Sequence, residues 1–305
     1  MKKQVWSPMM VTVIAALVLA ACVTTTGAPQ ATTAPAAAAV TTDSEAPKVS
    51  AETAVPAPGA SKKVDEIKAR GVINVAVLAE PPWLAENTTG TGPQYFGSAW
   101  IITEEIANRL GVKIAVTPVS HETKIPILAT GQVDVTVAPM AMTDERKKVV
   151  DFVEYSRASL CFYGLAANEK LASVKTVDDL NNAELTMAYL TGTPPETWAP
   201  KRFPNMKFRG VQTASGANGP IEEILAGRAD VAPIDNVVWP RLNSSQEGLV
   251  VFPKGDDCLR STENALPIGY AIDKGDPVFL QWLTDITAEI KNKYEAEEIR
   301  VMNMN

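Results

Sequence analysis

The chain has 305 residues, of which 46% are hydrophobic and 21% charged, enough apolar material for one large or two medium-sized globular domains. Lysine and arginine number 28 against 35 acids, giving a net charge of −7. An acidic chain repels phosphates, so general nucleic-acid binding is not expected. One histidine and three cysteines without a C-x-x-C pair cannot form the usual zinc clusters, and no metal or cofactor is expected.

The N-terminus has the pattern of a signal peptide. Two lysines precede an apolar run from Met9 to Ala21 that is short for a permanent membrane span. The run ends in Leu19-Ala20-Ala21-Cys22, which resembles a bacterial lipoprotein signal, where the chain is cut before a cysteine whose sulfur carries the lipid. We expect residues 1–21 to be the leader and Cys22 to hold the protein on the extracytoplasmic side of a membrane. An uncleaved anchor is the alternative.

The next segment is rich in Thr, Ala and Pro and has few large apolar side chains. Such a composition cannot bury enough surface to offset the loss of chain entropy. We expect the lipidated cysteine to begin a disordered tether over residues 22–61. No second long apolar run follows, which argues against a transmembrane protein.

The folded body is expected to begin near Lys62, where helical and strand patterns start to alternate. The patterns predict helices over 64–69 and 100–110, stopped by Gly71 and Gly111, and strands over 72–77 and 113–119. Alternation of this kind predicts an α/β fold with a mostly parallel sheet.

An internal repeat indicates where a site would lie. Residues 127–135 and 224–231 both read as a helix end, a glycine and a strand start. One copy alone could be any junction between a helix and a strand, but two copies suggest two similar lobes. Ligands of open α/β sheets bind beyond the carboxyl ends of the strands, so the residues after each copy become candidates.

The first candidate is Arg146. It follows the predicted strand 134–138 and lies one turn after Thr143, a plausible helix N-cap. A cation is disfavoured at a helix start unless it faces an anion, and a guanidinium there could bind a carboxylate with two hydrogen bonds. A solvated arginine beside two lysines is the alternative.

The second candidate is Asp235, directly after the predicted strand 230–234. Its carboxylate could hold an ammonium group, so that Arg146 and Asp235 together would recognise the two charges of a zwitterion. Taken alone, Asp235 could equally cap the helical segment that follows it.

The predicted folded body resembles the polar-amino-acid family of extracellular solute-binding proteins, the receptor components of ABC importers. The resemblance is carried by Ile125-Pro126-Ile127-Leu128, Thr143 to Phe152, Gly192-Thr193, Gly227 to Asp230, Gly269 to Ile272 and Gly275-Asp276-Pro277. It implies the two-lobed periplasmic-binding-protein type II fold, with two crossover strands at a hinge. The lobes are then expected at 62–159 plus 264–305 and at 160–263.

The resemblance also implies roles for individual residues. Arg146 would bind the α-carboxylate of an amino acid and Asp235 its α-ammonium, with Ala141 and Thr193 also at the ligand. The family uses an amide of the residue after Gly-Thr, which here is Pro194 and has no N–H. The Thr193 hydroxyl could substitute for that amide.

The pocket for the ligand side chain departs from the family pattern. Aromatic platforms are usual near the positions of Glu80 and His121, whereas this chain has an acid, an imidazole and the neighbouring Trp83. If Glu80 and His121 both point inward, they favour a polar or cationic ligand side chain. A half-exposed loop position is the alternative for His121.

Two cysteines remain after Cys22 is assigned to lipid. Cys161 and Cys258 lie near the two expected lobe crossings, and an oxidising compartment would permit a disulfide between them. Two buried thiols are the alternative, because distance in space cannot be read from the sequence.

The sequence therefore predicts a monomeric, lipid-anchored receptor rather than an enzyme. It would capture an amino acid or similar small carboxylate by hinge closure and present it to an ABC permease. A periplasmic dehydratase of cyclic amino-acid precursors and a sensor that signals to a membrane protein are the alternatives.

Overall fold

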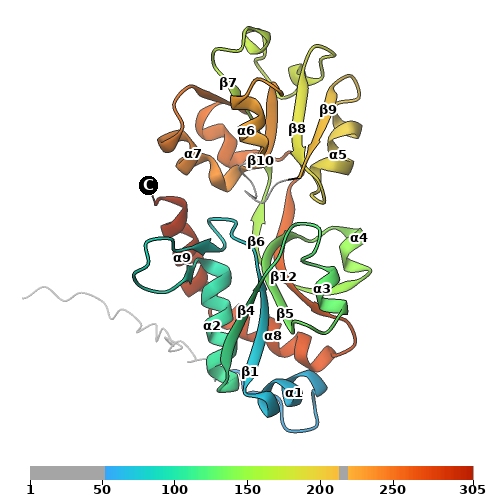
Figure 1. The fold of residues 1–305 in the computed structure, drawn as a ribbon, viewed down its shortest axis with the longest axis vertical. Helices are drawn as coiled ribbons and strands as arrows, with labels where there is room; N and C mark the ends of the chain where they lie inside the picture. Colours follow the sequence, from blue (N-terminus) through green and yellow to red (C-terminus); the bar gives the residue numbers. More distant parts are fainter. Residues whose placement is uncertain (1–51, 213–218, 305) are drawn as a thin grey trace, which may run out of the picture. The chain divides into compact units, whose positions relative to one another are not determined.

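Two five-stranded sheets organise residues 52–212 and 219–304, the part of the chain described by this computed structural model (Figure 1). The predicted leader, Cys22 and most of the predicted tether lie outside the described residues. None of the helices within the described ranges is long and apolar enough to cross a membrane.

The first sheet has the strand order β4-β1-β5-β12-β6. Its strands are β1 (Val72–Val77), β4 (Lys113–Pro118), β5 (Val135–Ala141), β6 (Val150–Ala158) and β12 (Leu266–Asp273). The segments connected to it are α1 (Lys62–Arg70), α2 (Ser98–Leu110), α3 (Pro126–Ala129), α4 (Asp144–Lys147), α8 (Pro277–Glu289), α9 (Lys291–Met302) and the short strands β2 (Ala85–Glu86) and β3 (Tyr95–Phe96).

The second sheet has the order β11-β7-β10-β8-β9. Its strands are β7 (Leu160–Leu165), β8 (Thr186–Leu190), β9 (Lys207–Val211), β10 (Val231–Asp235) and β11 (Leu249–Phe252). Its α-helices are α5 (Pro195–Arg202), α6 (Gly219–Leu225) and α7 (Trp239–Ser245), and its 3-10 helices are η1 (Glu169–Leu171), η2 (Asp178–Leu180), η4 (Asn236–Val238) and η5 (Gly255–Arg260).

Local sequence signals explain where the elements begin and end. The Ser61 hydroxyl accepts a hydrogen bond from the Val64 amide and so caps α1, which ends at Gly71 in the left-handed conformation. In the repeat, Gly131 and Gly227 both have a positive φ, +69° and +67°, and stand between a helix and a strand. The repeat therefore marks equivalent helix–strand junctions, one in each sheet.

The predicted mostly parallel sheet is only half correct. In the two sheets, the pairings among described strands are four parallel and four antiparallel. The antiparallel pairs all involve β6, β7 or β12, the strands next to the passages between the sheets. On its return to the first sheet the chain runs antiparallel to β5 and β6, and the local alternation of helices and strands does not show the direction of a returning strand.

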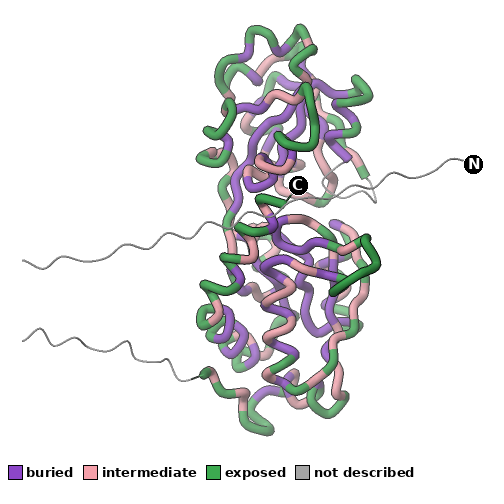
Figure 2. The backbone as a smooth tube through the Cα atoms, turned by 90° about the vertical axis from the view of Figure 1, so that its left-hand side faces the viewer, coloured by how far each residue is buried: buried purple, intermediate pink, exposed green. Residues whose placement is uncertain are grey.

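Two segments cross between the sheets side by side. β6 ends at Ala158 in the first sheet and β7 begins at Leu160 in the second, while the return passage leads into β12. The Leu160 amide donates to the Glu263 carbonyl at 2.7 Å, and the Ser261 hydroxyl donates to the Leu160 carbonyl at 2.6 Å. The predicted two-lobed α/β fold with two crossovers is confirmed, and buried backbone runs through both sheets (Figure 2).

The end of the predicted tether differs from the expectation. The Thr53 amide donates to Glu289 at 2.9 Å, the Thr53 carbonyl accepts from Arg109 at 3.1 Å, and Val55 packs against the core. Ser61 is 1% exposed. Residues 52–61 are therefore part of the folded body rather than of a disordered tether, because the ion pair between Arg109 and Glu289 offers hydrogen-bonding partners that composition cannot reveal.

Candidate functional site

One cleft is lined by residues from both sheets, and all seven predicted ligand-binding residues lie along it. They are Glu80, Trp83, His121, Ala141, Arg146, Thr193 and Asp235. Arg146 follows the end of β5 and Asp235 ends β10, so the repeat does bring the two opposite charges to one cleft.

Arg146 is positioned by the start of α4. The Thr143 hydroxyl accepts from the Arg146 amide at 3.3 Å, as the predicted N-cap requires. The guanidinium donates to the Ala141 carbonyl at 2.9 Å and to the Gly192 carbonyl, which lies after β8 in the second sheet, at 2.8 Å. Burial lowers the pKa of Arg146, opposed by the negative charge of Glu80, and a bound anion would offset this desolvation.

Asp235 ends β10 opposite Leu160 of β7. Although Asp235 precedes η4, its side chain makes no capping hydrogen bond within the described ranges, which removes the N-cap alternative. Burial and, to a smaller extent, the charge of Glu80 raise the pKa of Asp235 to about 7, against the opposing effect of Lys124. A ligand ammonium would stabilise the charged form of this carboxylate.

The Thr193 hydroxyl offers no hydrogen-bond donor to a ligand, contrary to the expectation. Its hydroxyl donates its proton to the Leu190 carbonyl at 2.5 Å, at the end of β8. That proton is then unavailable to a ligand carboxylate, so the expected substitution for the amide missing at Pro194 is wrong in this conformation. The physical reason is that the carbonyl at the strand end needs a donor, and the hydroxyl three residues later supplies it.

Glu80 and His121 both lie on the cleft, and a third residue joins them. His121 is 9% exposed, so it is not a half-exposed loop residue. Lys124, 2% exposed, places its Nζ 3.3 Å from Glu80 Oε2, 2.6 Å from the Pro139 carbonyl and 3.5 Å from His121 Nδ1. His121 Nε2 is 3.5 Å from Glu80 Oε1. Burial lowers the pKa of both Lys124 and His121.

Lys124 is a residue of the cleft that was not predicted from the sequence. Its neighbours Ser120, Glu122 and Thr123 are polar, and such a turn usually carries an exposed lysine. The available signal was weak: Lys124 stands three residues after His121 and directly before the Ile125-Pro126 motif.

Trp83 forms part of the cleft wall and is 3% exposed. Its indole N–H donates to the Ser156 hydroxyl at 3.0 Å, and that hydroxyl donates to Glu298 of α9 at 2.7 Å. The orientation of the wall therefore depends on a helix near the C-terminus as well as on the crossing strand β6.

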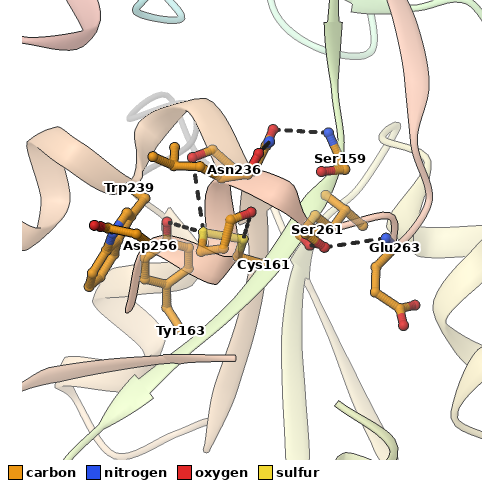
Figure 3. Close-up of a disulfide and its surroundings, with 11 residues drawn as sticks. Ser159, Cys161, Tyr163, Asn236, Trp239, Asp256, Ser261 and Glu263 are labelled. Atoms are coloured by element: carbon orange, nitrogen blue, oxygen red, sulfur yellow. Dashed lines mark hydrogen bonds between the residues drawn. A yellow bond between two sulfur atoms is a disulfide. The ribbon is translucent and has the colours of Figure 1, made fainter. Parts of the chain in front are cut away.

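A disulfide joins Cys161 at the start of β7 to Cys258 in η5, with the two Cα atoms 5.7 Å apart (Figure 3). Asn236, the residue after Asp235, lies beside it. Its side chain accepts from the Ser159 amide and donates to the Leu259 carbonyl, both at 3.0 Å. These contacts tie the strand end that carries Asp235 to both passages between the sheets.

Comparisons with known proteins agree with this geometry. A family model described as bacterial extracellular solute-binding proteins, family 3, matches residues 73–301. The L-cystine-binding protein TcyJ of Escherichia coli strain K12 is 24% identical over 233 residues, covering 75% of this chain and 80% of that protein.

Two solved structures are similar at 28% identity and a TM-score of 0.66. One is an ancestral amino acid-binding protein described as a precursor of cyclohexadienyl dehydratase, with 78% of this chain and 99% of that one covered. The other is a binding component of an ABC transporter from Wolinella succinogenes complexed with lysine, with 77% and 97% covered.

Proposed function

This chain belongs to the bacterial extracellular solute-binding proteins, family 3, and from that premise we propose that its cleft binds one amino acid for an ABC importer. The observation that carries the proposal is that Arg146, in the helix after β5, and Asp235, at the end of β10, place a cation and a carboxylate on one cleft. These charges match the α-carboxylate and α-ammonium of a zwitterion. The names of the similar binding proteins, for L-cystine, lysine and amino acids, support the same ligand class.

Arg146 has the capacity for this role. A guanidinium carries five N–H donors, and the two hydrogen bonds to Ala141 and Gly192 leave donors for a ligand carboxylate. Because Arg146 follows β5 in the first sheet and donates a hydrogen bond to the second, a bound carboxylate would strengthen the link between the two sheets.

We propose lobes at 62–159 plus 264–305 and at 160–263, with closure about the passages near Ser159 and Ser261, supported by the hydrogen bonds that pair these passages.

The proposal extends to membrane attachment. Lipidation of Cys22, supported by the Leu-Ala-Ala-Cys sequence, would hold a monomeric receptor near its permease. Cys22→Ser should move the protein from the membrane fraction to the soluble fraction of an expressing bacterium, and an unchanged distribution would contradict the anchor.

The test of ligand binding is isothermal titration calorimetry of the wild-type chain against the amino acids, alongside Arg146→Ala. We expect one ligand at one site and a loss of affinity of at least about a hundredfold in the variant, because the α-carboxylate loses a charge-assisted bidentate partner. Arg157→Ala, which removes an exposed arginine from the crossing strand β6, is the matched control and should bind normally. Equal binding by Arg146→Ala would remove this site assignment.

An enzymatic alternative comes from the acid–base groups of the cleft and from the ancestral dehydratase precursor to which the chain is similar. Incubation of the protein with prephenate or arogenate distinguishes the two functions. We expect no product above the rate of the buffer alone, whereas turnover lost in Glu80→Gln would favour the dehydratase.

A further inference from the structure

We propose that Lys124 is an internal counterion for Glu80 and that it restricts the cleft to amino acids with uncharged side chains, against lysine and arginine. This inference rests on the proposed amino-acid-binding function and specifies its ligand class.

The ammonium group of Lys124 is saturated by the protein. It has three N–H donors, and three protein acceptors surround it: the Pro139 carbonyl at 2.6 Å, Glu80 Oε2 at 3.3 Å and His121 Nδ1 at 3.5 Å. Lys124 therefore has no donor left for an acidic ligand group. Its role is to compensate charge inside the wall of the cleft.

The same contacts define which nitrogen of the His121 imidazole carries the proton. An ammonium group can only donate, so the Nδ1 atom that faces it must be the acceptor of a neutral imidazole. The proton is then on Nε2, which lies 3.5 Å from Glu80 Oε1. Nε2 makes no hydrogen bond to a described residue, so Lys124 is the group that pairs with Glu80, and the negative charge of Glu80 is already compensated before a ligand enters.

The charges around the cleft lead to the same ligand class. Among the lining residues in the described ranges, the charged groups are two cations, Lys124 and Arg146, and two carboxylates, Glu80 and Asp235. A zwitterion with an uncharged side chain leaves this balance unchanged. A lysine or arginine ligand would add an uncompensated positive charge beside the buried Lys124, which is strongly unfavourable at low local dielectric.

Of the expected polar or cationic ligand side chains, this inference keeps the polar ones and excludes the cationic ones. The two residues do lie on the cleft, but Lys124 Nζ, 3.3 Å from Glu80 Oε2, already supplies the cation that pairs with Glu80. The chain would therefore select differently from the similar structure that is complexed with lysine.

Three variants test the assignment, because each changes the charge of the cluster differently. Lys124→Met leaves Glu80 unpaired, Glu80→Gln leaves Lys124 unpaired, and the double variant removes both charges. Calorimetric titration of each protein with neutral amino acids, with lysine and arginine, and with glutamate and aspartate gives the preference as a ratio of affinities. Lys113→Met, an exposed lysine on β4, is the control for the loss of a lysine.

We expect the wild type, the double variant and Lys113→Met to prefer neutral ligands over lysine and arginine by at least about tenfold. Lys124→Met should shift the preference toward lysine and arginine by at least about tenfold, and Glu80→Gln should shift it toward the acidic ligands. If one single variant fails to fold, the other single variant and the double variant still carry the comparison.

A wild type that prefers lysine or arginine, or single variants with unchanged preference, would overturn the role of Lys124 while leaving the amino-acid receptor intact. A wild type that binds none of the amino acids would overturn the proposed function and this inference together.

Discussion

Asp235 shows how a single residue can make ligand binding depend on pH. Asp235 is half-buried at the end of β10, with Glu80 and Lys124 as the charged groups that act on it, and its pKa is raised to about 7 from an ordinary 3.8. Near neutral pH the free protein therefore holds Asp235 partly protonated. A ligand ammonium would favour the carboxylate, because an opposite charge lowers the pKa of an acid.

We expect ligand binding to release a fraction of a proton near pH 6.5, and the affinity to rise with pH until it levels off above about 8. Titration calorimetry in two buffers of different ionisation enthalpy measures this release. Burial lowers the pKa of His121 from its ordinary 6.5, so His121 loses its proton at a lower pH than Asp235 does. Binding without proton release at pH 6.5 would contradict the placement of the ligand ammonium at Asp235.

The free protein gives an independent check of the same group. A carboxyl whose folded-state pKa lies above its unfolded value binds its proton more tightly when folded, so it makes the free energy of unfolding fall as pH rises from about 4 to 7. Asp235→Asn should reduce this fall, and comparison of thermal unfolding of both proteins across that range measures the difference. An identical pH dependence would show that Asp235 is not the titrating group.

At the scale of elements, the passages between the sheets are held together near the site. The disulfide connects the start of β7 to η5 across a sequence separation of 97 residues, and Asn236 bonds to both passages beside it (Figure 3). Asp235 stands next to Asn236, so the position of the carboxylate depends on how these segments are joined.

Replacing Cys161 and Cys258 together by alanine should lower the free energy of unfolding by about 2–4 kcal/mol, because a long closed loop of the unfolded chain is released. Ligand affinity should also fall, since the end of β10 loses part of its support. Denaturant unfolding and calorimetric titration measure the two effects. Addition of a reductant should reproduce them in the wild type and change nothing in the double variant, whereas a wild type insensitive to reductant would contradict this role.

At the scale of the whole body, the cleft is complete only when both sheets are folded. Arg146 follows β5 of the first sheet and donates to Gly192 of the second, and the Thr191 hydroxyl donates to Glu122 at 3.2 Å across the same boundary. A ligand that contacts both sides therefore binds the folded protein and not the unfolded chain.

We expect the preferred amino acid at a hundred times its Kd to raise the free energy of unfolding by about 2.7 kcal/mol. A thermal-shift screen over the amino acids detects this as a rise in Tm and ranks the ligands. Arg146→Ala should show no rise with the same ligand, so an equal rise in that variant would mean that the stabilising molecule binds elsewhere.

The sequence by itself determined the α/β class, the repeated helix–glycine–strand junction, the N-cap at Thr143, and the positions of Arg146 after one strand and Asp235 at the end of another. These features depend on residues close together in the chain, whose period, caps and glycine conformations are local. The family resemblance extended the same local patterns to two lobes and a cleft.

Only the tertiary structure decided which of these groups remain available to a ligand. Lys124 reaches Glu80 from 44 positions away, the Thr193 hydroxyl is used by Leu190, and residues 52–61 pack on a core formed much later in the chain. Such contacts depend on where the folded backbone places charges and hydrogen-bonding groups, and no periodic pattern records them. The proposed ligand class depends on that placement, because the effect of a buried charge on a ligand depends on the partner that the charge has in the fold.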